Sequence, residues 1–279
     1  MSTRQLVSLH SAMRDDIQDL VTRRPLPGPG LPQVDPFLFL NHHGPQTYPQ
    51  NNRGLPFGPH PHRGFETVTF ILEGSLAHHD SGSGASVVEA GGVQWMTAGS
   101  GLVHAELSPE AFKRTGGPLE ILQLWVNLPG RLKMTDPAYI PVPAADIAAT
   151  DLGGGVSMRA VSGTEAAPIQ SLTNVMLGIV SVEPGSGATL TAPKGRNVLF
   201  YTIGGEAKIS GETVPEHTLA KLSYGDRVEV ASEGGCRILF GHADPIEEPV
   251  VAHGPFVMNT AAEITEAIRD YQAGKFGGL

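Results

Sequence analysis

Two short histidine units most constrain how this chain can fold. One is His60-Pro61-His62 and the other is His104-Ala105-Glu106. In a β-strand, residues two apart point to the same face, so each unit can direct two ligands toward one point. On neighbouring strands, the two units would offer three imidazoles and one carboxylate to a single divalent metal, and would leave coordination positions for water, oxygen or substrate. The pattern therefore predicts paired strands around a metal site in the first half of the chain.

Glu66 is a second carboxylate that could reach this point. It lies an even number of residues after His60 and His62, so all three side chains could face the same way along one strand. Spacing alone therefore leaves Glu66 and Glu106 as alternatives for the carboxylate ligand.

Two further histidine pairs, His42-His43 and His78-His79, consist of adjacent residues. Adjacent residues on a strand face opposite sides of the sheet. We therefore predict that neither pair supplies ligands to the metal.

The whole chain has the composition of an all-β protein. Its 35 glycines, 23 prolines and 17% charged residues favour many short strands joined by tight turns. Apolar and β-branched runs predict the strands, which we place at 65–72, 75–80, 85–89, 93–97, 120–128, 197–205, 218–222 and 237–241.

A proline-containing break from 128 to 143 separates the two halves, so we expect domains at 1–135 and 136–279. The second half repeats the strand-and-turn pattern, but its histidines, His217, His242 and His253, lie outside any paired unit. We therefore expect the second domain to lack metal ligands. Thr260 and Glu263 form a capping-box signature, which predicts a terminal helix that packs on a barrel.

The histidine units lie within longer motifs. Residues 54–66 read G-x5-H-x-H-x3-E, which resembles the first motif of the cupin superfamily, and residues 92–104 resemble the second, with Gly99 where that motif usually has proline. The segments 60–74, 94–106, 122–129, 247–260 and 270–277 are similar to pirins, so the chain is identified as a member of the pirin family. This resemblance covers nearly the whole chain. It implies two cupin (jelly-roll) β-barrel domains, the first of them metal-binding, with a C-terminal α-helix.

The resemblance also implies the ligand set. In pirins the carboxylate comes from the second unit, so the metal ligands would be His60, His62, His104 and Glu106. Glu66 would then have a supporting role, such as accepting a hydrogen bond that orients a ligand histidine. The resemblance implies Fe(II), while Mn, Ni, Cu, Zn or Co would also suit such ligands.

Two functions follow from the resemblance. The first is a quercetin 2,3-dioxygenase, which opens a flavonol ring with O₂ and releases CO. Its substrate would be a small aromatic molecule, and Glu106 would also take the hydroxyl proton. Four residues could line a flavonol pocket or belong to the barrel core: Phe57, Trp95, Met96 and Trp125. The alternative is a non-catalytic, iron-binding, redox-responsive partner protein that acts as a transcription cofactor.

Charge and composition exclude other classes. The net charge is −9 and no basic run exists, so we expect no direct nucleic-acid binding. Cys236 is the single cysteine, which excludes an internal disulfide and favours a reducing compartment. The sequence has no run of eighteen apolar residues and no signal-peptide core, so we expect a cytoplasmic protein without a membrane span.

Overall fold

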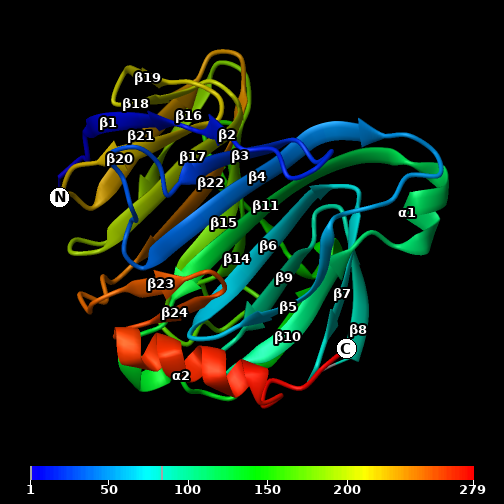
Figure 1. The fold of residues 1–279 in the computed structure, drawn as a ribbon. Coiled ribbons are helices and arrows are strands. Elements are labelled where there is room, and N and C mark those ends of the chain that lie inside the picture. The colour runs from blue at the N-terminus through cyan, green and yellow to red at the C-terminus, as the bar shows by residue number, and fades with distance from the viewer. Residues whose placement is uncertain (1, 83) are drawn as a thin grey trace. The chain divides into compact units, whose positions relative to one another are not determined.

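The computed structural model describes residues 2–82 and 84–279, and these residues are mostly β-strand, as predicted (Figure 1). The chain divides into two compact units, each built from a larger and a smaller β-sheet. We call residues 14–23, 37–144 and 246–279 the N-terminal barrel, and residues 1–13, 24–36 and 145–245 the C-terminal barrel. The predicted fold class, two cupin barrels with a terminal helix, is confirmed.

The N-terminal barrel contains a four-stranded sheet and most of a seven-stranded one. The four-stranded sheet has the order β5 (Phe57–His62), β10 (Leu102–Leu107), β7 (Ser75–Asp80) and β8 (Gly84–Glu89). The seven-stranded sheet has the order β12 (Ala138–Val142), β9 (Val93–Thr97), β6 (Phe65–Glu73), β11 (Gly117–Asn127), β4 (Phe37–Tyr48), β3 (Thr22–Leu26) and β2 (Met13–Arg14). Short helical turns are α1 (Glu110–Thr115), η1 (Gly130–Leu132) and η2 (Ala144–Asp146).

Both sheets of this barrel contribute to one buried core. Ile71 and Ile121 come from the seven-stranded sheet, and Leu76 and Val88 come from the four-stranded one. The predicted strand at 65–72 is β6, which is aromatic and β-branched and is buried along almost its whole length. This core joins β6 and β11 of the larger sheet to β7 and β8 of the smaller sheet, in which β7 pairs with the histidine-bearing strand β10.

The C-terminal barrel repeats the arrangement. Its larger sheet has the order β1 (Leu6–Ser11), β20 (Thr218–Leu222), β17 (Asn197–Gly205), β22 (Cys236–Ala243), β15 (Met176–Val182), β14 (Val156–Ser162) and β13 (Ala149–Gly153). Its smaller sheet has the order β16 (Ser186–Thr191), β21 (Arg227–Ser232), β18 (Ala207–Ile209) and β19 (Glu212–Val214). The predicted strands at 93–97, 197–205 and 218–222 have the observed bounds.

The C-terminal segment belongs to the N-terminal barrel. It forms the hairpin β23 (Val251–His253) and β24 (Phe256–Met258), and then α2 (Ala261–Gln272), beside β10 in Figure 1. Thr260 and Glu263 form the predicted capping box. Ile264 and Ala267 of α2 pack in one cluster with Val103 of β10. Each compact unit is therefore made of three separate segments of the chain. The expected domains, 1–135 and 136–279, were each one continuous segment. The division of the chain into folding domains stays a prediction.

No helix in the described part of the chain is long and apolar enough to cross a membrane.

Candidate metal centre

The two histidine units lie on neighbouring strands, as predicted. β5 and β10 pair antiparallel, and this pairing places His104 opposite His60. His60, His62 and His104 each offer a ring nitrogen, and these nitrogens all lie within 4.8 Å of one another. His62 and His104 are buried and His60 is half-buried. Three side chains from two strands thus converge on one point, although no ion is part of the structure.

Hydrogen bonds to backbone carbonyls fix the tautomers of two of these rings. Nδ1 of His60 lies 2.7 Å from the carbonyl oxygen of Gly58, and Nδ1 of His62 lies 3.2 Å from that of Pro255. A carbonyl oxygen can only accept, so each Nδ1 carries the hydrogen and donates it. The lone pair of each Nε2 is therefore left for a metal, and a carbonyl that orients the opposite nitrogen is usual for metal-binding histidines.

His104 supplies the observation that tests whether a metal fits. Its side chain is fully buried, and neither ring nitrogen has a hydrogen-bond partner among the described residues. An unpaired buried polar group is costly, so such a ring requires a partner that the protein chain does not provide. A divalent metal ion between the three imidazoles would meet this requirement.

The electrostatics of the site favour neutral imidazoles, the form that binds a metal. Burial, together with the neighbouring His60, lowers the pKa of His62 to about 3. Burial, with His62, His60 and His78 nearby, lowers the pKa of His104 well below its ordinary value. Protons therefore compete weakly for these two candidate ligands at neutral pH.

Glu106 lies outside the histidine group. Its Oε1 accepts a hydrogen bond from Thr69 Oγ1 at 3.1 Å, and its Oε2 accepts one from Gln123 Nε2 at 2.5 Å. The register of the β5–β10 pair shifts between His104 and Glu106, which accounts for their different surroundings despite their i,i+2 spacing. The role of Glu106 as a fourth ligand stays a prediction, and the structure shows a buried carboxylate held by two donors.

Among the described residues, Glu66 accepts no hydrogen bond from a candidate ligand histidine, which differs from the supporting role considered above. Its Oε1 accepts hydrogen bonds from Trp95 Nε1 at 3.0 Å and Thr97 Oγ1 at 2.7 Å. The physical reason is the strand register, because β6 pairs with β9 and Glu66 lies opposite Thr97. Oε2 of Glu66 is buried without a hydrogen-bond partner among the described residues, and burial raises the pKa of this carboxyl.

Asp80 and Tyr139 lie beside the centre and escaped the sequence analysis, which named their neighbour His78 only as a residue that supplies no ligand. The ring of His78 lies 5.4 Å from that of His104 and stacks on Tyr139 at 3.8 Å. Nε2 of His78 lies 2.8 Å from Oδ2 of Asp80. The His78-x-Asp80 spacing, two residues on one strand face, was the available signal, because β7 is the other neighbour of β10. His78 is not part of the three-histidine group.

The four candidate aromatic and apolar residues have different surroundings. Trp95 and Met96 are almost fully buried within β9. Trp125 packs edge-on against His62, with ring centroids 5.3 Å apart, and Phe57 lines a small cavity of about 10 Å³ that Glu106 also lines. Trp125 therefore lies beside His62, Phe57 lies near Glu106, and Trp95 contacts Glu66 through the hydrogen bond described above.

Comparisons with known proteins match the chain to one protein family. A family model described as Pirin matches residues 19–126, and one described as Pirin C-terminal cupin domain matches residues 179–277. A Pseudomonas aeruginosa protein with the provisional name quercetin 2,3-dioxygenase is 37% identical over 250 residues, which cover 87% of each chain. The crystal structure of quercetin 2,3-dioxygenase from Acinetobacter baumannii is 32% identical and matches with a TM-score of 0.93 over 99% of both chains. The bacterial pirin YhhW from Escherichia coli, solved in complex with nickel(II), is 18% identical and shares the fold, with a TM-score of 0.68 over 85% of this chain and 99% of its own.

Proposed function

Because this chain belongs to the pirin family, we propose that it is a metal-dependent dioxygenase of the quercetin 2,3-dioxygenase type. One observation carries the proposal: fully buried His104 has two ring nitrogens without partners and faces two histidines whose Nε2 atoms are free. The match to the quercetin 2,3-dioxygenase structure supports this choice of reaction.

The cupin fold and the histidine cluster point to a divalent metal. We propose that His60, His62 and His104 hold it with Glu106, and that the ion in the cell is Fe(II). When bound, such an ion would supply a Lewis-acidic centre for a deprotonated flavonol hydroxyl and for O₂. YhhW, a protein of the same fold, was solved with nickel(II), one of the divalent ions that would suit such ligands.

The residues of the chain would position the site and move the proton. The carbonyls of Gly58 and Pro255 hold the rings of His60 and His62 in one tautomer. Thr69 and Gln123 donate to the carboxylate of Glu106 and so fix its direction. We propose that Glu106 takes the hydroxyl proton of the flavonol, since it is the buried carboxylate two residues from His104 on the same strand.

A second candidate is a non-catalytic, iron-binding partner protein, in which the redox state of the ion alters a protein-binding surface. The pirin family, to which this chain belongs, also includes members that are not enzymes. The chain would be cytoplasmic in either case, as its buried free Cys236 suggests.

Oxygen consumption and CO release from a flavonol panel that includes quercetin test the dioxygenase. We expect slow turnover that a chelator stops and an added divalent metal restores. A folded, fully metallated sample that consumes no oxygen with any flavonol would contradict the proposal. A pull-down with the reduced and the oxidised metal would then test the partner protein, because the ion can shift binding only if its two states contact the partner differently.

A further inference from the structure

The C-terminal barrel has an open cavity that is unrelated to the histidine centre. Its volume is about 530 Å³, which lies within the range of small-molecule sites. The apolar part of its wall comes from β1, β17, β20 and the 31–35 segment, and consists of Val7, Leu31, Val34, Val198 and Leu222. A cavity of this size and lining could bury one flat apolar molecule.

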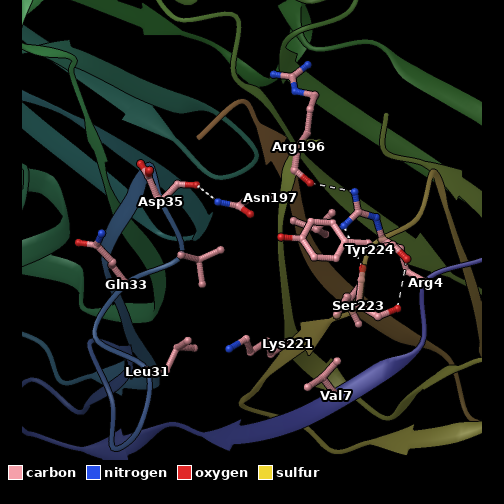
Figure 2. Close-up of a pocket in the computed structure, with 13 residues that line it drawn as sticks. Arg4, Val7, Leu31, Gln33, Asp35, Arg196, Asn197, Lys221, Ser223 and Tyr224 are labelled. Carbon is pink, nitrogen blue, oxygen red and sulfur yellow. Dashed lines mark hydrogen bonds between the residues drawn. The ribbon is translucent and has the colours of Figure 1, made fainter. Parts of the chain in front are cut away.

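Lys221 gives this cavity its charge. Figure 2 shows the ammonium group of Lys221 pointing toward Leu31 across the cavity. Lys221 forms no ion pair with any residue that the structure describes. The one acidic residue in the wall, Asp35, points its carboxylate away from Lys221 in Figure 2, and its backbone carbonyl accepts a hydrogen bond from Asn197 Nδ2 at 2.6 Å. The charge presented to the cavity is therefore positive, although the whole chain carries −9.

A buried guanidinium adds to this positive potential. Arg4 is 3% exposed, and its Nη atoms donate to the carbonyls of Arg196 at 2.8 Å and Ser223 at 3.1 Å. Its Nε has no hydrogen-bond partner among the described residues. Burial lowers the pKa of Arg4, although Asp226 acts in the opposite direction. Burial is the main cause that lowers the pKa of the nearby His242 to about 4, and the positive charges of Arg196 and Arg4 lower it further.

Tyr224 offers a surface for an aromatic ligand. Its side chain is 91% exposed although it lines the cavity, and Figure 2 shows its ring among the lining residues, between Asn197 and Arg4. Aromatic rings gain from offset or edge contacts with other rings, and a bound ring here would cover Tyr224.

We propose that this cavity binds a small aromatic carboxylate, whose charge meets Lys221 and whose ring lies against Val198, Leu222 and Tyr224. The ammonium group of Lys221, which has no ion pair among the described residues, favours an anionic ligand. The apolar wall favours a ligand with a hydrophobic ring. The site lies wholly within the C-terminal barrel and is independent of the proposed dioxygenase.

The test uses the full chain with its metal removed, so that a carboxylate cannot coordinate the ion. Isotopically labelled protein is titrated with 2-naphthoate and, separately, with the neutral 2-naphthamide, while calorimetry measures both affinities. We expect saturable naphthoate binding with shifts in the amide signals of residues 198, 222 and 224. We also expect naphthoate to bind about tenfold more tightly than the amide, as one charge-assisted bond allows.

Three variants locate the effect. Lys221→Gln should abolish the preference for naphthoate, while Lys113→Gln, which removes the same charge from the N-terminal barrel, should leave it unchanged. Val7→Trp places bulk in the cavity from an exposed position and should weaken both ligands at least ~10-fold. Circular dichroism checks that each variant is folded. No saturable binding at millimolar ligand, equal affinity for acid and amide, or shifts confined to the N-terminal barrel would each overturn the proposal.

Discussion

His62 Nδ1 donates a hydrogen bond to the carbonyl oxygen of Pro255, 3.2 Å away and 193 residues later in the chain. The C-terminal segment therefore supplies the group that orients a candidate metal ligand. The next residue, Arg63, strengthens the link: its Nη1 lies 2.9 Å from Oδ2 of Asp270, and its guanidinium lies 4.6 Å from the ring centre of Phe276. The tail after residue 246 thus contacts the proposed metal centre through Pro255 and is anchored beside it through Arg63.

Weakening this link should lower metal affinity without removing a ligand. Asp270→Asn takes away the charge that holds Arg63, and we expect metal affinity to fall about tenfold, as for other residues that support ligands. Competition with a fluorescent chelator measures the change. Asp244→Asn is the matched control, because Asp244 pairs with Arg196 in the C-terminal barrel at 3.6 Å. Equal affinities for both variants would show that the tail does not support the centre.

Substitutions of Glu106 and Glu66 test which of the two carboxylates binds the metal. Glu106→Gln should lower metal content and abolish turnover, because it removes the proposed ligand and proton acceptor. Glu66→Gln should keep most of the metal, since the amide oxygen can still accept from Trp95 and Thr97. Measuring the metal content of both purified variants tests this expected difference. Equal loss in both would make Glu66 a ligand too, and loss in the Glu66 variant alone would reverse the assignment.

The stability of the metal-free protein should fall as pH decreases from about 6.5 toward 3. The folded pKa of His62 is about 3, so over this window the unfolded chain binds a proton that the folded chain does not, and acid favours unfolding. The loss is up to ~1.4 kcal/mol per pH unit for one such group. Urea unfolding at several pH values, with chelator present, should give a shallower pH dependence for His62→Gln. Identical slopes for the wild type and this variant would contradict the assigned pKa.

Lys133 should be a strong determinant of stability. Its buried Nζ donates to the carbonyls of Gly64 at 2.9 Å and Val257 at 3.1 Å, and to Oδ1 of Asn127 at 2.7 Å. Lys133→Met would leave these buried acceptors unpaired, and we expect a loss of ~2–4 kcal/mol in the free energy of unfolding. Lys113→Met, at a more exposed lysine, should cost less than ~0.5 kcal/mol. If Lys133→Met and Lys113→Met both lowered the free energy of unfolding by a similarly small amount, water would be replacing the ammonium group of Lys133 as the donor.

Local patterns predicted much of this protein, and long-range relationships account for what they missed. The spacing of His60, His62 and His104 predicted their convergence, because strand periodicity is local and strict. The capping box at Thr260 likewise predicted α2. Pro255, in contrast, reaches His62 only through the packing of the tail on the N-terminal barrel, for which the sequence carries no local signal. The different surroundings of Glu106 arise from a register shift, which periodicity cannot reveal.

The central claim is that the three-histidine centre holds the metal that opens a flavonol ring. Its most direct test measures bound metal and CO released from quercetin under air in wild type, His104→Gln and His242→Gln. We predict one metal ion per chain and CO release for the wild type and for His242→Gln, a control at a buried histidine of the C-terminal barrel. We predict loss of both for His104→Gln. A metallated, folded wild type that releases no CO, or a His104→Gln variant with undiminished metal and CO, would contradict the claim.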